Sequence, residues 1–239
     1  MESSAADPTA HLLRHERLGI VATVGLLGVL GWAYLLRGMP MHMMEPPLAA
    51  LITMWWLMML AMMLPSAIPA VLLYSRVRLS RPGDAGIART WVFLFGYLAV
   101  WLAFSFAAAI TQMLVADSAM ALRDSRAKGA LLIAAGLYQI SPFKSACISQ
   151  CRSPGQFIAR HWRPGWGGAA RLGVLHGAYC VGCCWMLMAL LFVGGVMNLL
   201  WIVGLTALVA AEKLLPAALK LPKISGIALI GSGLWTALN

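Results

Sequence analysis

The fold class is decided by residues 48–74, LAALITMWWLMMLAMMLPSAIPAVLLY, a run without a charged side chain. About 20 consecutive apolar residues are enough to cross the hydrocarbon core of a bilayer as an α-helix, so this run predicts a membrane span. The whole chain agrees, because 61% of its 239 residues are hydrophobic and only 11% are charged. A soluble domain of this length needs more charged surface, so the composition indicates a membrane protein.

Six further apolar runs flank this one, and together they predict an all-α, polytopic membrane helical bundle. The seven predicted spans are 18–36, 48–74, 90–115, 129–140, 169–193, 199–215 and 224–238. Residues 1–17 form a polar N-terminal tail, and residues 18–239 form a single transmembrane domain. The run at 129–140 is the shortest, so it either crosses as a tilted span, continues as a helix through Cys151, or leaves six spans.

The distribution of Lys and Arg predicts how the bundle is oriented. With the N-terminus inside, the tail and the connectors 75–90, 141–171 and 212–223 hold 14 of the 18 basic residues, and the outer connectors hold four. The positive-inside rule therefore favours N-in and C-out. The net charge of +10 is spread over connectors, which indicates anionic lipid head groups as the counter-charge and no nucleic acid partner.

One predicted span carries an unusual set of metal-binding side chains. The segment HGAYCVGCCWMLM, residues 176–188, contains His176, Cys180, Cys183 and Cys184. Each residue of an α-helix advances by about 100°, so these four side chains share one face. Gly173 and Gly177 lie on or beside that face, which lets a neighbouring helix approach closely. Thiolate and imidazole donors suit soft or borderline ions such as Cu(I) and Zn(II). The alternative is that these cysteines only pack as small apolar residues.

A second cysteine pair lies in YQISPFKSACISQCRSP, residues 138–154. Cys147 and Cys151 are four residues apart, so they share a face if this stretch is helical. Two thiolates can hold Cu(I) in a nearly linear arrangement, and Lys144 and Arg152 are placed to offset the negative charge of such a complex. We therefore predict that this pair also binds metal.

Methionines predict a place where the metal is taken up. The connector RGMPMHMMEPP, residues 37–47, contains the predicted uptake residues Met39, Met41, His42, Met43 and Met44. Thioethers remain metal donors in an oxidising compartment, so a loop of this kind on the outer face fits copper capture. A stripe of Met54, Met58 and Met62, with Met59 and Met63 beside it, follows on the next span, where it either passes a soft ion inward or packs in the core.

Two polar residues frame the sixth predicted span. Glu212, in VAAEKLLP, lies near its inner end, where the carboxylate either balances charge, relays a proton or pairs with Lys213. Asn198 stands at the start of the span and is expected to satisfy free backbone groups there.

These motifs resemble a family of bacterial integral membrane proteins that were grouped as a domain of unknown function and described as predicted metal-binding proteins. Some members are assigned as copper chaperones supporting a polyphenol oxidase. The matching strings are YQISPFKSACISQCRSP, GAYCVGCCWMLM, GGVMN and EK, which with the methionine-rich span cover residues 40–215. The resemblance implies a bacterial inner-membrane protein that handles copper, with motif cysteines at Cys147, Cys151, Cys180, Cys183 and Cys184 and a motif acid at Glu212.

The sequence thus predicts a copper-binding protein, not an enzyme, that acquires Cu(I) and delivers it to, or holds it for, a copper-dependent enzyme. Two alternatives stay open. The first is a membrane thiol-disulfide oxidoreductase with Cys180 and Cys183 as its active pair. The second is a structural accessory subunit of a membrane oxidase or monooxygenase complex, because ten Trp and long apolar faces suit a protein interface.

Overall fold

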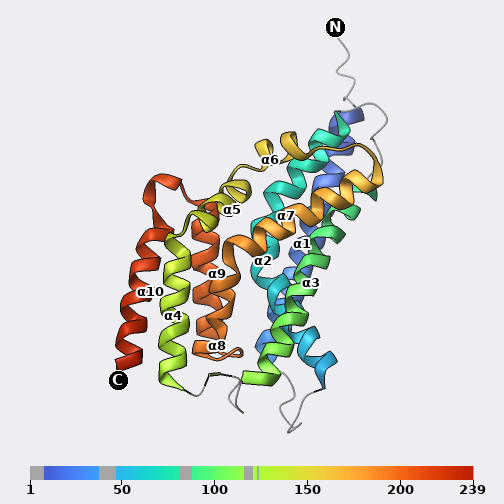
Figure 1. Ribbon diagram of the computed structural model, residues 1–239. Coiled ribbons are helices and arrows are strands. Elements are labelled where there is room, and N and C mark those ends of the chain that lie inside the picture. Colours follow the sequence, from blue (N-terminus) through green and yellow to red (C-terminus); the bar gives the residue numbers. More distant parts are fainter. Residues whose placement is uncertain (1–7, 38–46, 81–87, 116–120, 123, 239) are drawn as a thin grey trace.

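The computed structural model is an all-α bundle, as the sequence predicts (Figure 1). It describes residues 8–37, 47–80, 88–115, 121–122 and 124–238, and it has no strand within them. The α-helices are α1 (Pro8–Arg37), α2 (Leu48–Leu79), α3 (Ala88–Val115), α4 (Ser125–Ile140), α5 (Pro142–Arg152), α6 (Pro154–His161), α7 (Gly165–Ala189), α8 (Leu191–Gly194), α9 (Leu199–Leu214) and α10 (Leu221–Leu238). Each predicted span lies on a helix, except that 169–193 covers both α7 and α8, and α1 begins inside the predicted polar tail.

Five helical segments are long and apolar enough to cross a membrane, or six if a bent pair counts as one span. The five are Arg17–Arg37, Leu48–Leu79, Ala88–Val115, Gly165–Gly194 and Ala217–Leu238. The pair is α4 with α5, which meet at an angle of 62°. The predicted seven spans also included 199–215, where α9 has 16 residues and is shorter than the usual crossing length of about 20.

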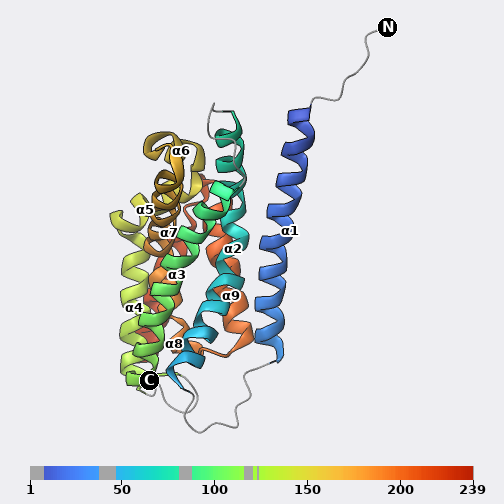
Figure 2. The same cartoon turned by 90° about the vertical axis from the view of Figure 1, so that its right-hand side faces the viewer.

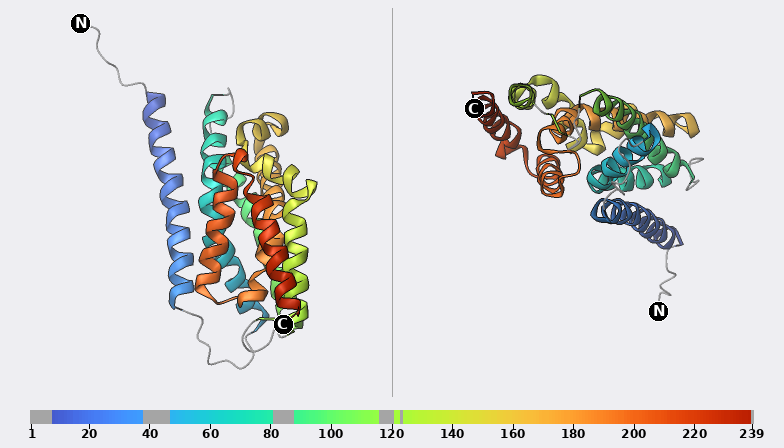
Figure 3. Two further views of the ribbon diagram at one scale, coloured as in Figure 1. Left: turned by 90° about the vertical axis from the view of Figure 1, so that its left-hand side faces the viewer. Right: turned by 90° about the horizontal axis from the view of Figure 1, so that it is seen from below.

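Successive long helices run in opposite directions through the bundle (Figure 1). The start of α1, the end of α2, helices α5 and α6, and the end of α9 gather at one end, while α8 and the end of α10 lie at the other. Helix α1 stands beside α2 at the edge of the bundle (Figures 2 and 3). The described residues of the connectors predicted to lie on the inner side therefore share one end of the molecule.

Glycines allow two helix pairs to approach closely. Gly173 and Gly177 on α7 face α3, and a Cβ added to Gly173 would lie 2.0 Å from the carbonyl oxygen of Phe93. Gly129 on α4 meets Gly233 on α10 in the same manner. Between membrane helices, where the lipid is as apolar as the side chains, such small-residue contacts supply much of the packing energy. The sequence prediction for Gly173 and Gly177 is confirmed.

Polar residues fix the helix boundaries near the site. The side chain of Ser141 accepts a hydrogen bond from the Lys144 backbone N–H at 3.3 Å, and Pro142 occupies the first turn, so α5 starts afresh after α4 ends. Asn198 caps α9 in the same way, accepting from Trp201 N–H at 3.3 Å, as predicted. The bend after α4 turns the Cys147 and Cys151 helix across the bundle toward α7.

Candidate metal centre

Thiols from two helices meet in the interior. Cys180, Cys183 and Cys184 on α7 are at most 2% exposed, and their shared face is turned toward the protein. Cys151 reaches them from α5, with its Sγ 4.0 Å from Cys183 Sγ. All five cysteines of the chain are free thiols in the structure. The helical-face prediction for the three α7 cysteines is therefore confirmed, and the two sequence motifs meet at Cys151.

Cys147 takes a different position on α5. It is half-buried, and a Cβ built on Gly182 would lie 2.9 Å from its Sγ, so the thiol rests against a gap in the α7 side chains. Close by, Tyr138 on α4 donates a hydrogen bond from its hydroxyl group to the Gly182 carbonyl oxygen. The missing side chain at Gly182 thus lets α5 lie directly on α7, which brings Cys151 to the buried thiols.

A buried lysine contacts the thiol cluster. Lys213, at the end of α9, is 8% exposed, and its Nζ lies 3.0 Å from Cys180 Sγ. The same ammonium lies 3.2 Å from Ser66 Oγ, so its described contacts are sulfur and hydroxyl groups. Tyr97 on α3 reaches Cys180 as well, with its hydroxyl oxygen 3.3 Å from Sγ. A buried cation beside thiols is suited to stabilise negative charge on them.

A methionine adds a thioether to the buried thiols, and we call Met63, Cys151, Cys180, Cys183 and Cys184 together the sulfur group. Met63 on α2 is fully buried, with its Sδ 3.9 Å from Cys184 Sγ and 3.8 Å from Lys213 Nζ. The other methionines of α2, from Met54 to Met62, are at most 2% exposed. They occupy the part of the helix between its N-terminal end and Met63. A buried series of thioethers therefore leads along α2 to the thiols.

His176 lies one turn before Cys180 on α7 and is 3% exposed. Its ring packs among aromatic rings, at centroid distances of 5.4 Å from Phe157, 5.7 Å from Tyr97 and 6.0 Å from Phe93. Its Nδ1 atom is buried and has no hydrogen-bond partner among the described residues. The predicted role of His176 as a metal ligand stays a prediction.

Glu212 belongs to a second buried polar group. Its carboxylate pairs with Lys144 Nζ at 2.6 Å and accepts hydrogen bonds from Gln139 Nε2 at 2.6 Å and Ser225 Oγ at 3.2 Å. The sequence suggested a pair with the adjacent Lys213, but consecutive residues of a helix point in different directions. Lys144 was expected to offset negative charge at the thiols, but it neutralises Glu212 instead. The ammonium group beside the thiols belongs to Lys213.

The sulfur separations within two pairs are short enough for one metal ion to bind both atoms of a pair. With metal–sulfur bonds of about 2.3 Å, two sulfur ligands lie about 3.8 Å apart at a tetrahedral angle and about 4.6 Å apart when linear. The pairs Cys151–Cys183, at 4.0 Å, and Cys184–Met63, at 3.9 Å, fall in this range. In the described part of the chain, no group of three or more His, Cys, Asp or Glu side chains is arranged to hold a metal ion. Paired sulfurs suit the low coordination numbers of a soft ion.

A comparison with protein-family models decides the family. The PpoB2 family model, described as copper chaperone, matches residues 52–236, which include every helix that contributes to the sulfur group. The chain belongs to the copper chaperone family. Searches of curated proteins and of solved structures gave no match. Family membership implies copper binding and, in general, a copper-dependent partner enzyme, and it confirms the family that the sequence motifs resemble.

The candidate site contains residues that the sequence did not single out. Lys213 was considered only as a partner of Glu212, Met63 only as a neighbour of the methionine stripe, and Tyr97 not at all. The string EK was the available signal for Lys213, because it is part of the family resemblance. The predicted uptake residues Met39, Met41, His42, Met43 and Met44 lie outside the described residues.

Proposed function

We propose that the chain binds Cu(I) in the membrane with two thiolates from the group Cys151, Cys180, Cys183 and Cys184 and transfers it to a copper-dependent enzyme. The observation that supports this most strongly is the convergence of sulfur atoms from α2, α5 and α7 at separations of 3.9 and 4.0 Å. Thiolate and thioether ligands select Cu(I) over harder ions.

Charge balance supports a cuprous complex with two thiolates. Cu(I) carries one positive charge, so two thiolates make a complex with one negative charge, and the ammonium of Lys213 neutralises it. Charges buried in a protein interior are costly unless they are paired. Zinc with four thiolates would leave two negative charges at a site where the described contacts supply the single ammonium of Lys213.

The methionines of α2 fit the predicted path of the metal. Copper taken up at the 37–47 connector would meet Met54, Met58 and Met62, and then Met63, which contacts Cys184. Adjacent turns of a helix rise by about 5.4 Å, so sulfur atoms on successive turns are near enough for exchange between ligands when their side chains move. Transfer between similar soft ligands needs no nucleotide hydrolysis.

The thiol-disulfide oxidoreductase is a second candidate because of one contact. Cys151 and Cys183 come from different helices, and their sulfur atoms lie 4.0 Å apart. Modest side-chain movement would permit a disulfide of about 2.05 Å, releasing two electrons and two protons to a quinone acceptor. The active pair would then be Cys151 and Cys183 rather than Cys180 and Cys183. Met63 and Lys213 would have no direct role in that reaction.

Metal content separates the two functions. The full chain is purified anaerobically from copper-grown cells next to the variant C180S/C183S/C184S, and copper and free thiols are measured per chain. The matched control is M188L, which alters another buried sulfur on α7. The proposal predicts about one copper or more per chain in wild type and M188L, and its loss in the cysteine variant. Copper-free wild-type protein with a Cys151–Cys183 disulfide would instead favour the oxidoreductase.

A further inference from the structure

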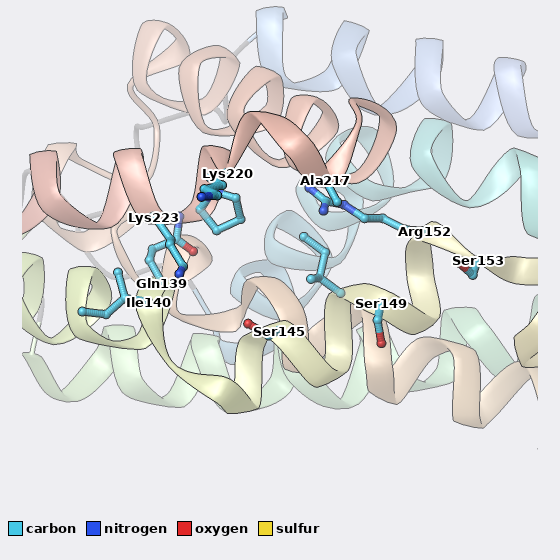
Figure 4. A pocket seen from close by; sticks show the side chains of 11 residues that line it. Gln139, Ile140, Ser145, Ser149, Arg152, Ser153, Ala217, Lys220 and Lys223 are labelled. Atoms are coloured by element: carbon cyan, nitrogen blue, oxygen red, sulfur yellow. The ribbon is translucent and has the colours of Figure 1, made fainter.

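A cavity of about 390 Å³ opens where α4 and α5 meet the connector between α9 and α10 (Figure 4). It lies at the end of the bundle that holds α5 and the end of α9, next to the Glu212 group. Three basic side chains line it, from Arg152, Lys220 and Lys223, together with the hydroxyl groups of Ser145, Ser149 and Ser153.

The lining of this cavity is positively charged. Lys220 and Lys223 stand at one side of it and Arg152 at the other (Figure 4). Of the residues that the structure describes, no Asp or Glu lines it. The carboxylate of Glu212, which accepts a hydrogen bond from the lining residue Gln139, is already paired with Lys144. The hydroxyl groups of Ser145 and Ser149 donate to backbone carbonyls of α5 or its cap, so the attraction for a ligand comes mainly from the three cations.

Arg152 carries a buried donor without an acceptor. Its Nε donates to the Glu212 carbonyl oxygen at 2.7 Å, which fixes the guanidinium group against the end of α9. Its Nη2 atom is buried and has no partner among the described residues. Buried polar atoms are nearly always hydrogen-bonded, so this nitrogen, in a residue that lines the cavity, lacks an acceptor. An anionic oxygen is the strongest acceptor for such a group.

The two lysines stand where a helix disfavours cations. Lys220 precedes α10 and Lys223 lies in its first turn, at the positive end of the helix dipole, where anions are stabilised and cations are not. Lys220 also adopts a left-handed conformation with φ of +48°, which a side chain other than Gly or Asn adopts at some cost. An anion in the cavity would compensate for the charge of both lysines.

We propose that this cavity binds the phosphate group of an anionic molecule, supplied either by a phospholipid head group or by free phosphate. The planar guanidinium of Arg152 and the ammonium groups of Lys220 and Lys223 are the side chains that recognise phosphate oxygens. Basic pockets between membrane helices on the cytoplasmic side bind anionic head groups, and the sequence predicts this end of the bundle to be cytoplasmic. The site involves no copper and is independent of the proposed chaperone function.

The test uses the metal-free full chain in a neutral detergent. Native mass spectrometry measures retention of phosphatidylglycerol against phosphatidylcholine, and thermal unfolding measures the shift in Tm caused by inorganic phosphate. The pocket variant is K220G/K223Q, because glycine at position 220 also relieves the left-handed backbone and should not destabilise the fold. The control variant R160Q/R163Q removes the same charge from exposed side chains that do not line the cavity.

We expect wild type and R160Q/R163Q to bind the anion and K220G/K223Q to bind it roughly 30-fold more weakly, since each lysine near a phosphate contributes about fivefold. Selective retention of phosphatidylglycerol identifies a lipid head group, and a phosphate-dependent rise in Tm identifies a free anion. Equal binding by wild type and K220G/K223Q, or equal loss in both variants, would overturn the proposal. Absence of lipid selectivity together with absence of a phosphate shift in wild type would do the same.

Discussion

Replacing Lys213 with methionine should weaken copper binding without weakening the metal-free fold. In the proposed complex, Lys213 neutralises a cuprous bis-thiolate of charge −1. In the empty site of K213M, the thiols can hold their protons, so no charge is left unpaired. The substitution should therefore lower the stability of the copper-loaded protein and leave the stability of the metal-free protein unchanged.

The magnitude follows from the geometry. Lys213 Nζ lies 3.0 Å from Cys180 Sγ, and a full charge pair at that distance attracts by about 5.5 kcal/mol at an effective dielectric constant of about 20. The charge of the complex is spread over the metal and two sulfurs, and at a mean distance of about 6 Å the attraction is about 2.8 kcal/mol. K213M should thus bind Cu(I) about 100-fold more weakly. In the metal-free protein the protonated thiols form no ion pair with Lys213, so K213M should leave its stability unchanged or raise it.

The assay is an anaerobic competition for Cu(I) between the detergent-solubilised chain and a chromophoric Cu(I) chelator, with thermal unfolding of the metal-free protein beside it. K213R keeps the charge and should retain most of the affinity. R126M removes an exposed charge at the start of α4 and should behave as wild type. Unchanged Cu(I) affinity in K213M, or an equal loss in R126M, would refute the charge-balance argument.

Three further predictions concern the packing around the site. M63L should bind Cu(I) about tenfold more weakly in the same competition assay, because it removes a sulfur donor with little change in volume. M59L alters an equally buried methionine of α2 and should match wild type. Equal affinity in both variants would show that Met63 does not belong to the site. E212Q should lower the free energy of unfolding by about 3–5 kcal/mol in denaturant titrations, since it leaves Lys144 without its carboxylate partner. The double variant E212Q/K144M should recover most of that loss. A double variant no more stable than E212Q would contradict the ion pair. G173A should lower the Tm strongly, because its Cβ would lie 2.0 Å from the Phe93 carbonyl oxygen. G204A adds a Cβ with no atom within 4 Å and should keep a Tm near the wild-type value. A lower Tm for G204A than for G173A would mean that α3 and α7 are not in close contact.

The sequence predicts those features of the fold that depend on the periodicity and length of single segments. Uncharged runs locate the helices, the Cys180, Cys183 and Cys184 spacing predicts their common face, and Asn198 predicts a helix start. Gly173 and Gly177 predict a close neighbour for α7 but do not identify it as α3. Helix pairing depends on contacts between distant segments, which the pattern of one segment does not contain.

The same limit applies to the candidate site. Local spacing identifies the cysteine motifs, but the approach of Lys213 to Cys180 depends on how α9 packs against α7. The two lysines also differ from their expected partners. Lys144, on the same helix as Cys147 and Cys151, pairs with Glu212 on α9, whereas Lys213 contacts Cys180. Proximity in sequence suggested a Glu212–Lys213 pair and a role for Lys144 beside the thiols. That suggestion was wrong because adjacent residues of a helix do not share a face.

The most direct test of the account is the X-ray absorption spectrum at the copper edge of the anaerobically loaded full chain, recorded beside C180S/C183S/C184S loaded in the same manner. The account predicts Cu(I) with a first shell dominated by sulfur in wild type, and loss of that shell in the variant. A shell of nitrogen and oxygen atoms alone, or a sulfur shell that is unchanged in the variant, would contradict it.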